Sequence, residues 1–127
     1  MQGKHLYEYA VIRLVPRVER EEFFNVGIIL FSKRAKYIKA LYKVDEDKLN
    51  LFSSELDREA LFANLHVFDR ICSGANDGGP IASLDIPERF RWLTALRSSC
   101  IQTSRPHVGF SANLDQTLND LFQELVE

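Results

Sequence analysis

Residues 13–25 read RLVPRVEREEFFN and concentrate arginine and glutamate between two apolar segments. The guanidinium group of arginine presents a planar fork of donors that matches a carboxylate or a phosphate. The stretch therefore predicts an anion-binding site, whose candidate residues are Arg13, Arg17, Arg20 and Asn25. The alternative is that the arginines form ion pairs with the glutamates of the same stretch, which would fix a loop and contribute little else.

A second polar stretch, residues 97–109, reads RSSCIQTSRPHVG. Hydroxyl groups and arginines together supply hydrogen-bond donors to an oxyanion without a competing negative charge. Its candidate ligand-binding residues are Arg97, Ser98, Ser104 and His107. The alternative is that Ser and Thr satisfy local backbone groups, as they commonly do in loops.

His107 is the only histidine whose setting suggests chemistry. A general base needs an orienting carboxylate and a pocket, and Glu22 is the candidate partner if the two polar stretches meet in space. This interpretation predicts a hydrolase or nuclease acting on a phosphorylated substrate, with arginines neutralising the developing charge. The sequence has no P-loop, dinucleotide fingerprint or nucleophile elbow, and its His and Cys residues lack zinc-site spacing, so we expect no cofactor and no metal.

A basic segment, residues 33–43, offers a third interpretation. Its lysines and arginine, with Tyr37 and Tyr42, could bind single-stranded nucleic acid through phosphate contacts and base stacking. The formal net charge of -2 argues against this interpretation. A solvated basic face followed by a solvated acidic one is the ordinary explanation.

The N-terminal part of the chain predicts three strands, at residues 6–15, 25–32 and 37–44. They are rich in β-branched and aromatic residues, and the short link before residue 37 predicts an antiparallel hairpin within a meander. Pro16 is expected to end the first strand, because it lacks a backbone donor. Gly27 predicts a bulge or a close backbone approach.

The remainder predicts helices at residues 45–52, 57–72, 87–96 and 113–127, with a loop at 73–80 and irregular or extended chain at 97–112. Pro87 suits the first turn of its helix, and Asn113 with Gln116 has the spacing of a helix cap. The fold class is therefore α+β, a single domain of residues 1–127. Its antiparallel sheet, with the hairpin in the N-terminal half, is expected to be packed by two main helices, 57–72 and 113–127.

The amino-acid composition indicates to which broad class of proteins the chain belongs. Of the 127 residues, 46% are hydrophobic and 27% charged, which is the balance of a globular domain. No signal peptide and no membrane-length apolar stretch is expected, and the two isolated cysteines suit a reducing compartment. We therefore expect a cytoplasmic protein.

Two groups of motifs resemble one known family. Residues 7–16 (YEYAVIRLVP) with 21–27 (EEFFNVG), and residues 89–93 (RFRWL) with 97–98 and 104–109 (SRPHVG), are similar to the domain-of-unknown-function family numbered 3037. That family implies no activity. Its members are small bacterial proteins, some encoded beside kinases of the HipA-like type, so the resemblance implies such a kinase as partner. The motif positions that carry over as candidates are Arg13, Arg17, Arg20, Glu22, Asn25, Arg97, Ser98, Ser104 and His107.

From residues and resemblance together we expect a non-enzymatic binding or regulatory module for a protein partner or a small anionic ligand. The hydrolase or nuclease and the nucleic-acid-binding protein remain the alternatives. The oligomeric state and the identity of the ligand do not follow from the sequence.

Overall fold

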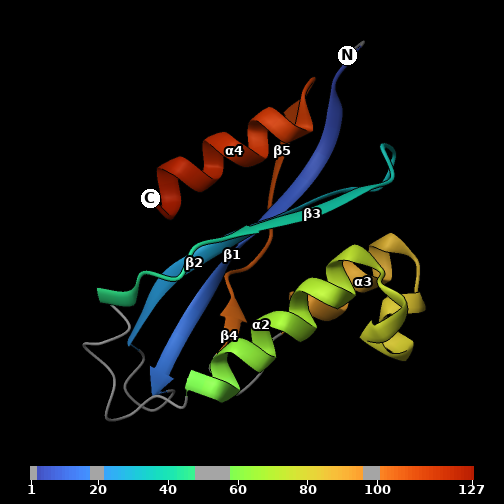
Figure 1. The fold of residues 1–127 in the computed structure, drawn as a ribbon. Helices are drawn as coiled ribbons and strands as arrows, with labels where there is room; N and C mark the ends of the chain where they lie inside the picture. Colours follow the sequence, from blue (N-terminus) through green and yellow to red (C-terminus); the bar gives the residue numbers. More distant parts are fainter. Residues whose placement is uncertain (1–2, 18–21, 48–57, 96–100) are drawn as a thin grey trace.

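The structure, a computed structural model, describes residues 3–17, 22–47, 58–95 and 101–127, with only the backbone of residues 16, 17, 22 and 58. It has three layers, in which helices cover both faces of one antiparallel sheet (Figure 1). Helix α4 lies on one face, and helices α2 and α3 lie on the other (Figure 1). The fold class predicted from the sequence, α+β with an antiparallel sheet, is confirmed.

The sheet contains five strands in the order β3-β2-β1-β4, with β5 also paired to β1. They are β1 (His5–Arg17), β2 (Glu22–Ser32), β3 (Tyr37–Tyr42), β4 (Ile101–Thr103) and β5 (His107–Ser111). The two short strands share one edge of the long strand β1. Strand β5 pairs with residues 5–9 of β1, and β4 pairs with residues 12–14.

The helices are α2 (Arg58–Ser73), α3 (Ile86–Leu93) and α4 (Leu114–Leu125). Two 3₁₀ turns, η2 (Asn76–Gly78) and η3 (Pro80–Ser83), connect α2 to α3; η2 lies within the predicted loop 73–80, and η3 extends beyond it. Helix α3 begins after the cap Asp85, which accepts a hydrogen bond from the Glu88 amide, and has a proline in its first turn. It ends at Leu93, three residues before the predicted end at 96.

Alternation along the strands divides the core in two. Ala10, Ile12 and Leu14 of β1 point toward α2 and α3, whereas Val11 points toward α4. The apolar stripe of α4 packs on Val11, Ile28 and Leu30, as the 3.6-residue period predicts. Its members are Leu114, Leu118, Leu121, Phe122, Leu125 and Val126.

Two local predictions about β1 and β2 have different outcomes. Gly27 lies beside a bulge and makes a close approach: the register shifts after the Ile12–Gly27 pair, and an added Cβ at Gly27 would collide with the Leu41 carbonyl oxygen. Pro16 was expected to end the first strand, which is wrong, because β1 continues to Arg17. The missing donor is accommodated by a register irregularity between Leu14 and Arg17.

The C-terminal half of the chain contributes two further strands to the sheet. Residues 101–103 and 107–111, predicted as irregular or extended, form strands of the sheet. The expected helix at 45–52 lies mostly outside the described residues, although Glu46 and Asp47 are helical.

Candidate functional site

The two polar stretches meet in the sheet. Arg13 of β1 pairs with Asn25 of β2 on one side and with Gln102 of β4 on the other. The Arg13 guanidinium carbon lies 4.3 Å from the ring centroid of Phe23, a side chain that is half exposed. The Arg13 Nε atom is buried and has no hydrogen-bond partner among the described residues. Arg13 is thus held between β2 and β4, with its guanidinium against the Phe23 ring.

Asn25, predicted to position a ligand, holds the end of a helix. Its Nδ2 atom donates a 2.9 Å hydrogen bond to the carbonyl oxygen of Leu125, in the last turn of α4. The last carbonyls of a helix have no partner within the helix, so this side chain supplies one. The Asn25 amide is thereby committed to the fold.

Ser104, another predicted ligand residue, closes the gap between β4 and β5. Its backbone amide donates to the Val11 carbonyl (2.8 Å), and its Oγ accepts from the Val11 amide (2.9 Å). The same hydroxyl donates to the Arg105 carbonyl at 3.0 Å. Ser104 is buried, and its hydroxyl takes the place of a backbone group in the sheet.

His107 is exposed on the face of the sheet that α4 covers. Its ring stacks on Tyr9, with 5.2 Å between the centroids. The pairing of His107 with Glu22 is wrong: His107 lies opposite Tyr9, whereas Glu22 lies opposite Arg17. Eight strand residues separate these positions, about 26 Å, so the strand register holds the backbones of the two residues far apart.

The side chains of five further candidates lie outside the part of the chain that the structure describes. These candidates are Arg17, Arg20, Glu22, Arg97 and Ser98. Whether the arginines bind an anion or pair with neighbouring glutamates stays a prediction.

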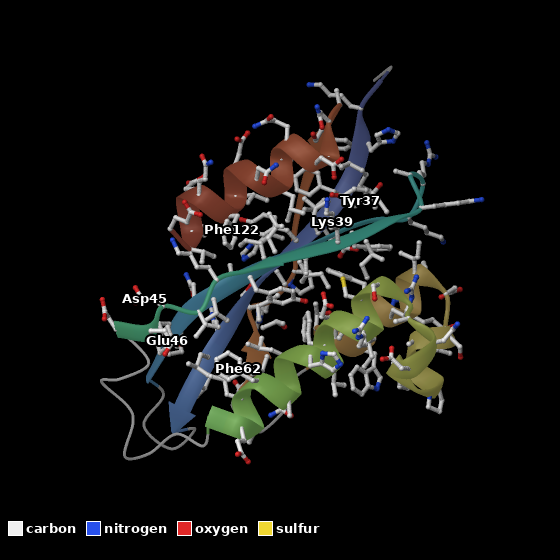
Figure 2. All side chains as sticks on the ribbon, in the orientation of Figure 1. Tyr37, Lys39, Asp45, Glu46, Phe62 and Phe122 are labelled. Carbon is white, nitrogen blue, oxygen red and sulfur yellow. The ribbon has the colours of Figure 1, made fainter. Side chains whose placement is uncertain are left out.

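The basic segment does not assemble a stacking platform. Tyr37 and Tyr42 point to opposite faces of β3, toward α4 and toward α2 respectively. The Tyr37 hydroxyl donates a 2.7 Å hydrogen bond to Asp115, and the Lys39 ammonium lies 3.7 Å from the same carboxylate. Figure 2 shows Tyr37 and Lys39 on the side of β3 that faces α4. The Tyr42 ring packs edge-on against Phe68, so neither tyrosine is presented for base stacking.

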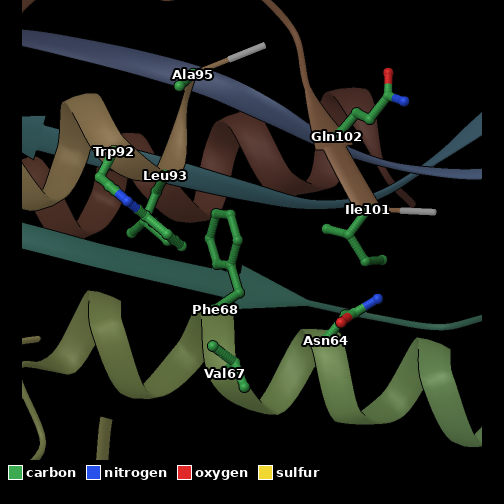
Figure 3. Close-up of a pocket in the computed structure, with 8 residues that line it drawn as sticks. All are labelled: Asn64, Val67, Phe68, Trp92, Leu93, Ala95, Ile101 and Gln102. Carbon is green, nitrogen blue, oxygen red and sulfur yellow. The ribbon is translucent and has the colours of Figure 1, made fainter. Parts of the chain in front are cut away.

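A small cavity of about 200 Å³ lies between α2, α3 and β4 (Figure 3). Its walls include Phe68, Leu93 and Ile101, which belong to the buried core. Pockets that hold drug-sized ligands have volumes of roughly 300–1,000 Å³. This cavity, which opens at the surface beside the exposed Asn64 and Val67, is smaller than a site for a ligand of that size.

A larger groove lies on the same face, where β5 meets the first half of β1. Leu6 pairs with Phe110, and Val108 lies opposite Glu8, so their side chains share the face of the buried Ala10. Their exposed fractions are 48% for Leu6, 65% for Val108 and 56% for Phe110. The volume of this β1–β5 groove is about 760 Å³. Large apolar side chains are thus exposed side by side, which is typical of an interaction surface.

The rim of the β1–β5 groove is mainly basic. Lys4 precedes β1, and Lys33 and Arg34 lie in the turn that links β2 to β3. Among the described residues that line the groove, Glu8 is the one acidic side chain. The rim surrounds an apolar floor formed by Leu6, Phe31, Val108 and Phe110, and its charge is complementary to that of acidic groups. The basic segment predicted from the sequence therefore contributes two cations to this surface.

Sequence reasoning did not identify the groove. Its signal was the alternation in residues 107–111, HVGFS, which places Val108 and Phe110 on one face of a strand. Pro106 and Gly109 obscured that strand, because both are usual markers of irregular chain.

Other features of a site were sought in the described ranges. No three His, Cys, Asp or Glu side chains come together there as metal ligands. Of the helices in those ranges, none has the length and apolar character needed to cross a lipid bilayer.

Comparison with known proteins assigns a family but no activity. No curated protein and no solved structure matches the chain. The model of one family, described as a protein of unknown function (DUF3037), matches residues 9–126, nearly the whole chain. The resemblance seen in the two groups of motifs is confirmed, and the chain belongs to the DUF3037 family.

Proposed function

We propose that this protein is a non-enzymatic binding module that docks a segment of a protein partner in the β1–β5 groove. The observation that carries the proposal is the exposure of Leu6, Val108 and Phe110 on one face of the sheet, beside a basic rim. Water-exposed apolar area of this kind gives a partner a large gain on burial, about 25 cal/mol per Å². The exposed position of His107, remote from Glu22, favours binding over catalysis.

Selection of displayed peptides tests the proposal without a known partner. A random peptide library is panned on the wild-type protein, on Val108→Asp and on Val67→Asp. Val67 is the matched control, because it is exposed to a similar extent (48%) but lies on α2. We expect the wild-type protein and Val67→Asp to enrich the same peptides and Val108→Asp to enrich none of them. Enrichment of the same peptides by all three proteins, or by none, would refute the proposal.

A kinase of the HipA-like type is the first full-length partner to test, on the strength of the family resemblance alone. The measurement is the dissociation constant for purified kinase with the wild-type protein, Val108→Asp and Val67→Asp. Loss of binding in Val108→Asp alone supports docking of the kinase in the groove. Equal binding by all three proteins would place the kinase elsewhere.

A small anionic ligand at Arg13 is the second candidate function. Its support is the buried Arg13 Nε atom, which lacks a partner among the described residues, together with the stacked Phe23 ring. The test is a thermal-shift screen against nucleotides and phosphorylated metabolites, because a ligand that binds the native state raises the melting temperature. We expect the shift to disappear in Arg13→Gln and to persist in Lys43→Gln, an exposed cation past the end of β3.

A further inference from the structure

The β1–β5 groove lies in the same layer as two helices of the chain itself. On this face α2 packs against β3 and β4, and α3 packs against β2 and β3 (Figure 1). Neither α2 nor α3 covers the first half of β1 and β5 on this face, and Leu6, Val108 and Phe110 are exposed there. Two neighbouring strands are together about 10 Å wide, which is close to the diameter of one α-helix, about 10–12 Å.

We propose that the groove receives an amphipathic α-helix of a partner, with acidic residues beside its apolar stripe. This inference rests on the proposed function and adds the chemistry of the partner segment. A segment that lies on the face of a sheet finds side chains beneath it, not backbone groups. An extended chain there would bury N–H and C=O groups without partners, whereas a helix satisfies them internally.

The charges around the β1–β5 groove are complementary to a partner segment with negative charge. Within the described part of the lining, three cations, Lys4, Lys33 and Arg34, outnumber one acidic residue, Glu8. Glutamate or aspartate on the flank of the docked helix would pair with these cations and speed association. A second copy of this chain docked groove to groove would bring two basic rims together, which electrostatic repulsion opposes.

A partner at the edge of the sheet would be an extended strand, whereas a partner on this face would be a helix. Strand β5 pairs with β1 on one side and is the last strand at that end of the described sheet. A peptide that added a strand to β5 would bond to its backbone at the edge and would leave the apolar floor exposed. The exposed area lies on the face, so the structure favours the helix.

Three synthetic peptides of about 18 residues test the inference, a length at which a helix can form when its apolar face is docked. The first carries Leu and Phe at positions i, i+3, i+4 and i+7 with Glu on both flanks. The second has the same composition in an order that destroys the stripe, and the third carries Lys in place of Glu. Binding is followed by fluorescence anisotropy, peptide helicity by circular dichroism, and the contact surface by the methyl NMR signals of Leu6 and Val108.

We expect the first peptide to bind, to gain helicity and to shift those methyl signals. Its affinity should fall at least about tenfold in Lys33→Glu/Arg34→Glu, or 1.4 kcal/mol, and should weaken between roughly 0.05 and 0.5 M salt. Lys43→Glu is the matched control, because Lys43 follows the far end of β3, about 20 Å along the strand from the turn. The second and third peptides should bind at least about tenfold more weakly.

Two results would overturn the inference and leave the proposed function standing. One is a peptide selected on the groove that stays extended and protects the β5 backbone amides from hydrogen exchange. The other is tighter binding of the Lys peptide. A homodimer that Val108→Asp dissociates, with no peptide bound, would make a second copy the occupant and overturn it as well. If no peptide of any kind binds and the library selection is also empty, the proposed function itself fails.

Discussion

At the scale of single residues, Ser104 connects the segment between β4 and β5 to β1 through two hydrogen bonds with Val11. The interval between β4 and β5 has no regular ladder, and the Val11 amide donates instead to the Ser104 hydroxyl at 2.9 Å. Ser104 was predicted from the sequence to bind a ligand, and in the structure its hydroxyl is bonded within the sheet. Ser and Thr hydroxyls commonly replace a backbone acceptor where a strand is interrupted.

Ser104→Ala should lower the free energy of unfolding by about 1–3 kcal/mol, because it leaves the buried Val11 amide without an acceptor. Ser83→Ala is the matched control, since the Ser83 hydroxyl is exposed and donates to the Pro80 carbonyl oxygen three residues earlier. It should change stability by no more than about 0.5 kcal/mol. Urea denaturation measures both, and equal effects would contradict the role given to Ser104.

Gly27 is constrained by the backbone of the neighbouring strand. An added Cβ would collide with the Leu41 carbonyl oxygen and lie 3.2 Å from the Ile12 Cδ1 atom. Gly27→Ala should therefore destabilise the protein by about 1–3 kcal/mol. Gly109→Ala is the comparison, because its Cβ would meet the side chain of Tyr7, which can rotate away. A loss of stability in Gly109→Ala as large as in Gly27→Ala would contradict this difference between a fixed backbone atom and a movable side chain.

At the scale of elements, α4 is attached to the sheet at both ends as well as through its apolar stripe. Near its start, Asp115 accepts a hydrogen bond from Tyr37 and lies 3.7 Å from the Lys39 ammonium. At its end, Asn25 donates to the Leu125 carbonyl. The exposed contacts at Asp115 contribute little to stability, so the stripe and the Asn25 bond position the helix.

Asn25→Ala should cost about 0.5–1.5 kcal/mol, the usual net value of one hydrogen bond. Asn25→Asp should cost more, because a carboxylate cannot donate and lies at the negative end of the helix dipole. Amide hydrogen exchange should rise in the last turn of α4 in both variants. Asn119→Ala, an exposed change on the same helix, should leave that exchange unchanged. If Asn25→Asp is as stable as the wild type, the capping role is wrong.

Helix α2 is terminated by a buried arginine from α3. The Arg89 Nη1 atom donates to the carbonyl oxygens of Ile71 and Cys72, each at 3.3 Å. Cations near the end of a helix interact favourably with its dipole. Arg89 lies in one of the stretches that resemble the family, and its side chain joins two helices of the same layer.

At the scale of the whole molecule, the buried titratable groups make stability sensitive to alkaline pH. Burial, followed by the charge of Asp69, raises the pKa of the Cys72 thiol from 9.0 to about 12. Burial also raises the pKa of Tyr42, with smaller contributions from Cys72 and Asp69. In each case the folded state keeps its proton at a pH at which the unfolded state loses it.

The free energy of unfolding should therefore be independent of Cys72 ionisation below pH 9 and should fall as the pH rises from 9.0 toward about 12. Each group contributes up to about 1.4 kcal/mol per pH unit within its window. Cys72→Ala and Tyr42→Phe should both flatten this fall in urea denaturation series, whatever their stability at neutral pH. Ser73→Ala removes no titratable group and should retain the wild-type slope, and an unchanged slope in Cys72→Ala would contradict the assignment.

The sequence by itself determined the elements whose pattern is local. The stripe of α4, the cap Asn113, the β2–β3 hairpin and the alternation of β1 follow from periods of 3.6 and 2.0 residues. Gly27 was recognisable because a glycine within an apolar strand signals close backbone approach. Each of these signals is contained within a few neighbouring residues.

Only the tertiary structure decided which distant residues meet. The register of β1 with β4 and β5 places Arg13 beside Gln102 and separates His107 from Glu22, and no local period encodes a register between strands about 90 residues apart. The same register exposes Val108 and Phe110 beside Leu6, because helices α2 and α3 cover β2, β3 and β4 on that face. Whether an apolar residue is core or interface depends on what covers it, and that is a property of packing rather than of sequence.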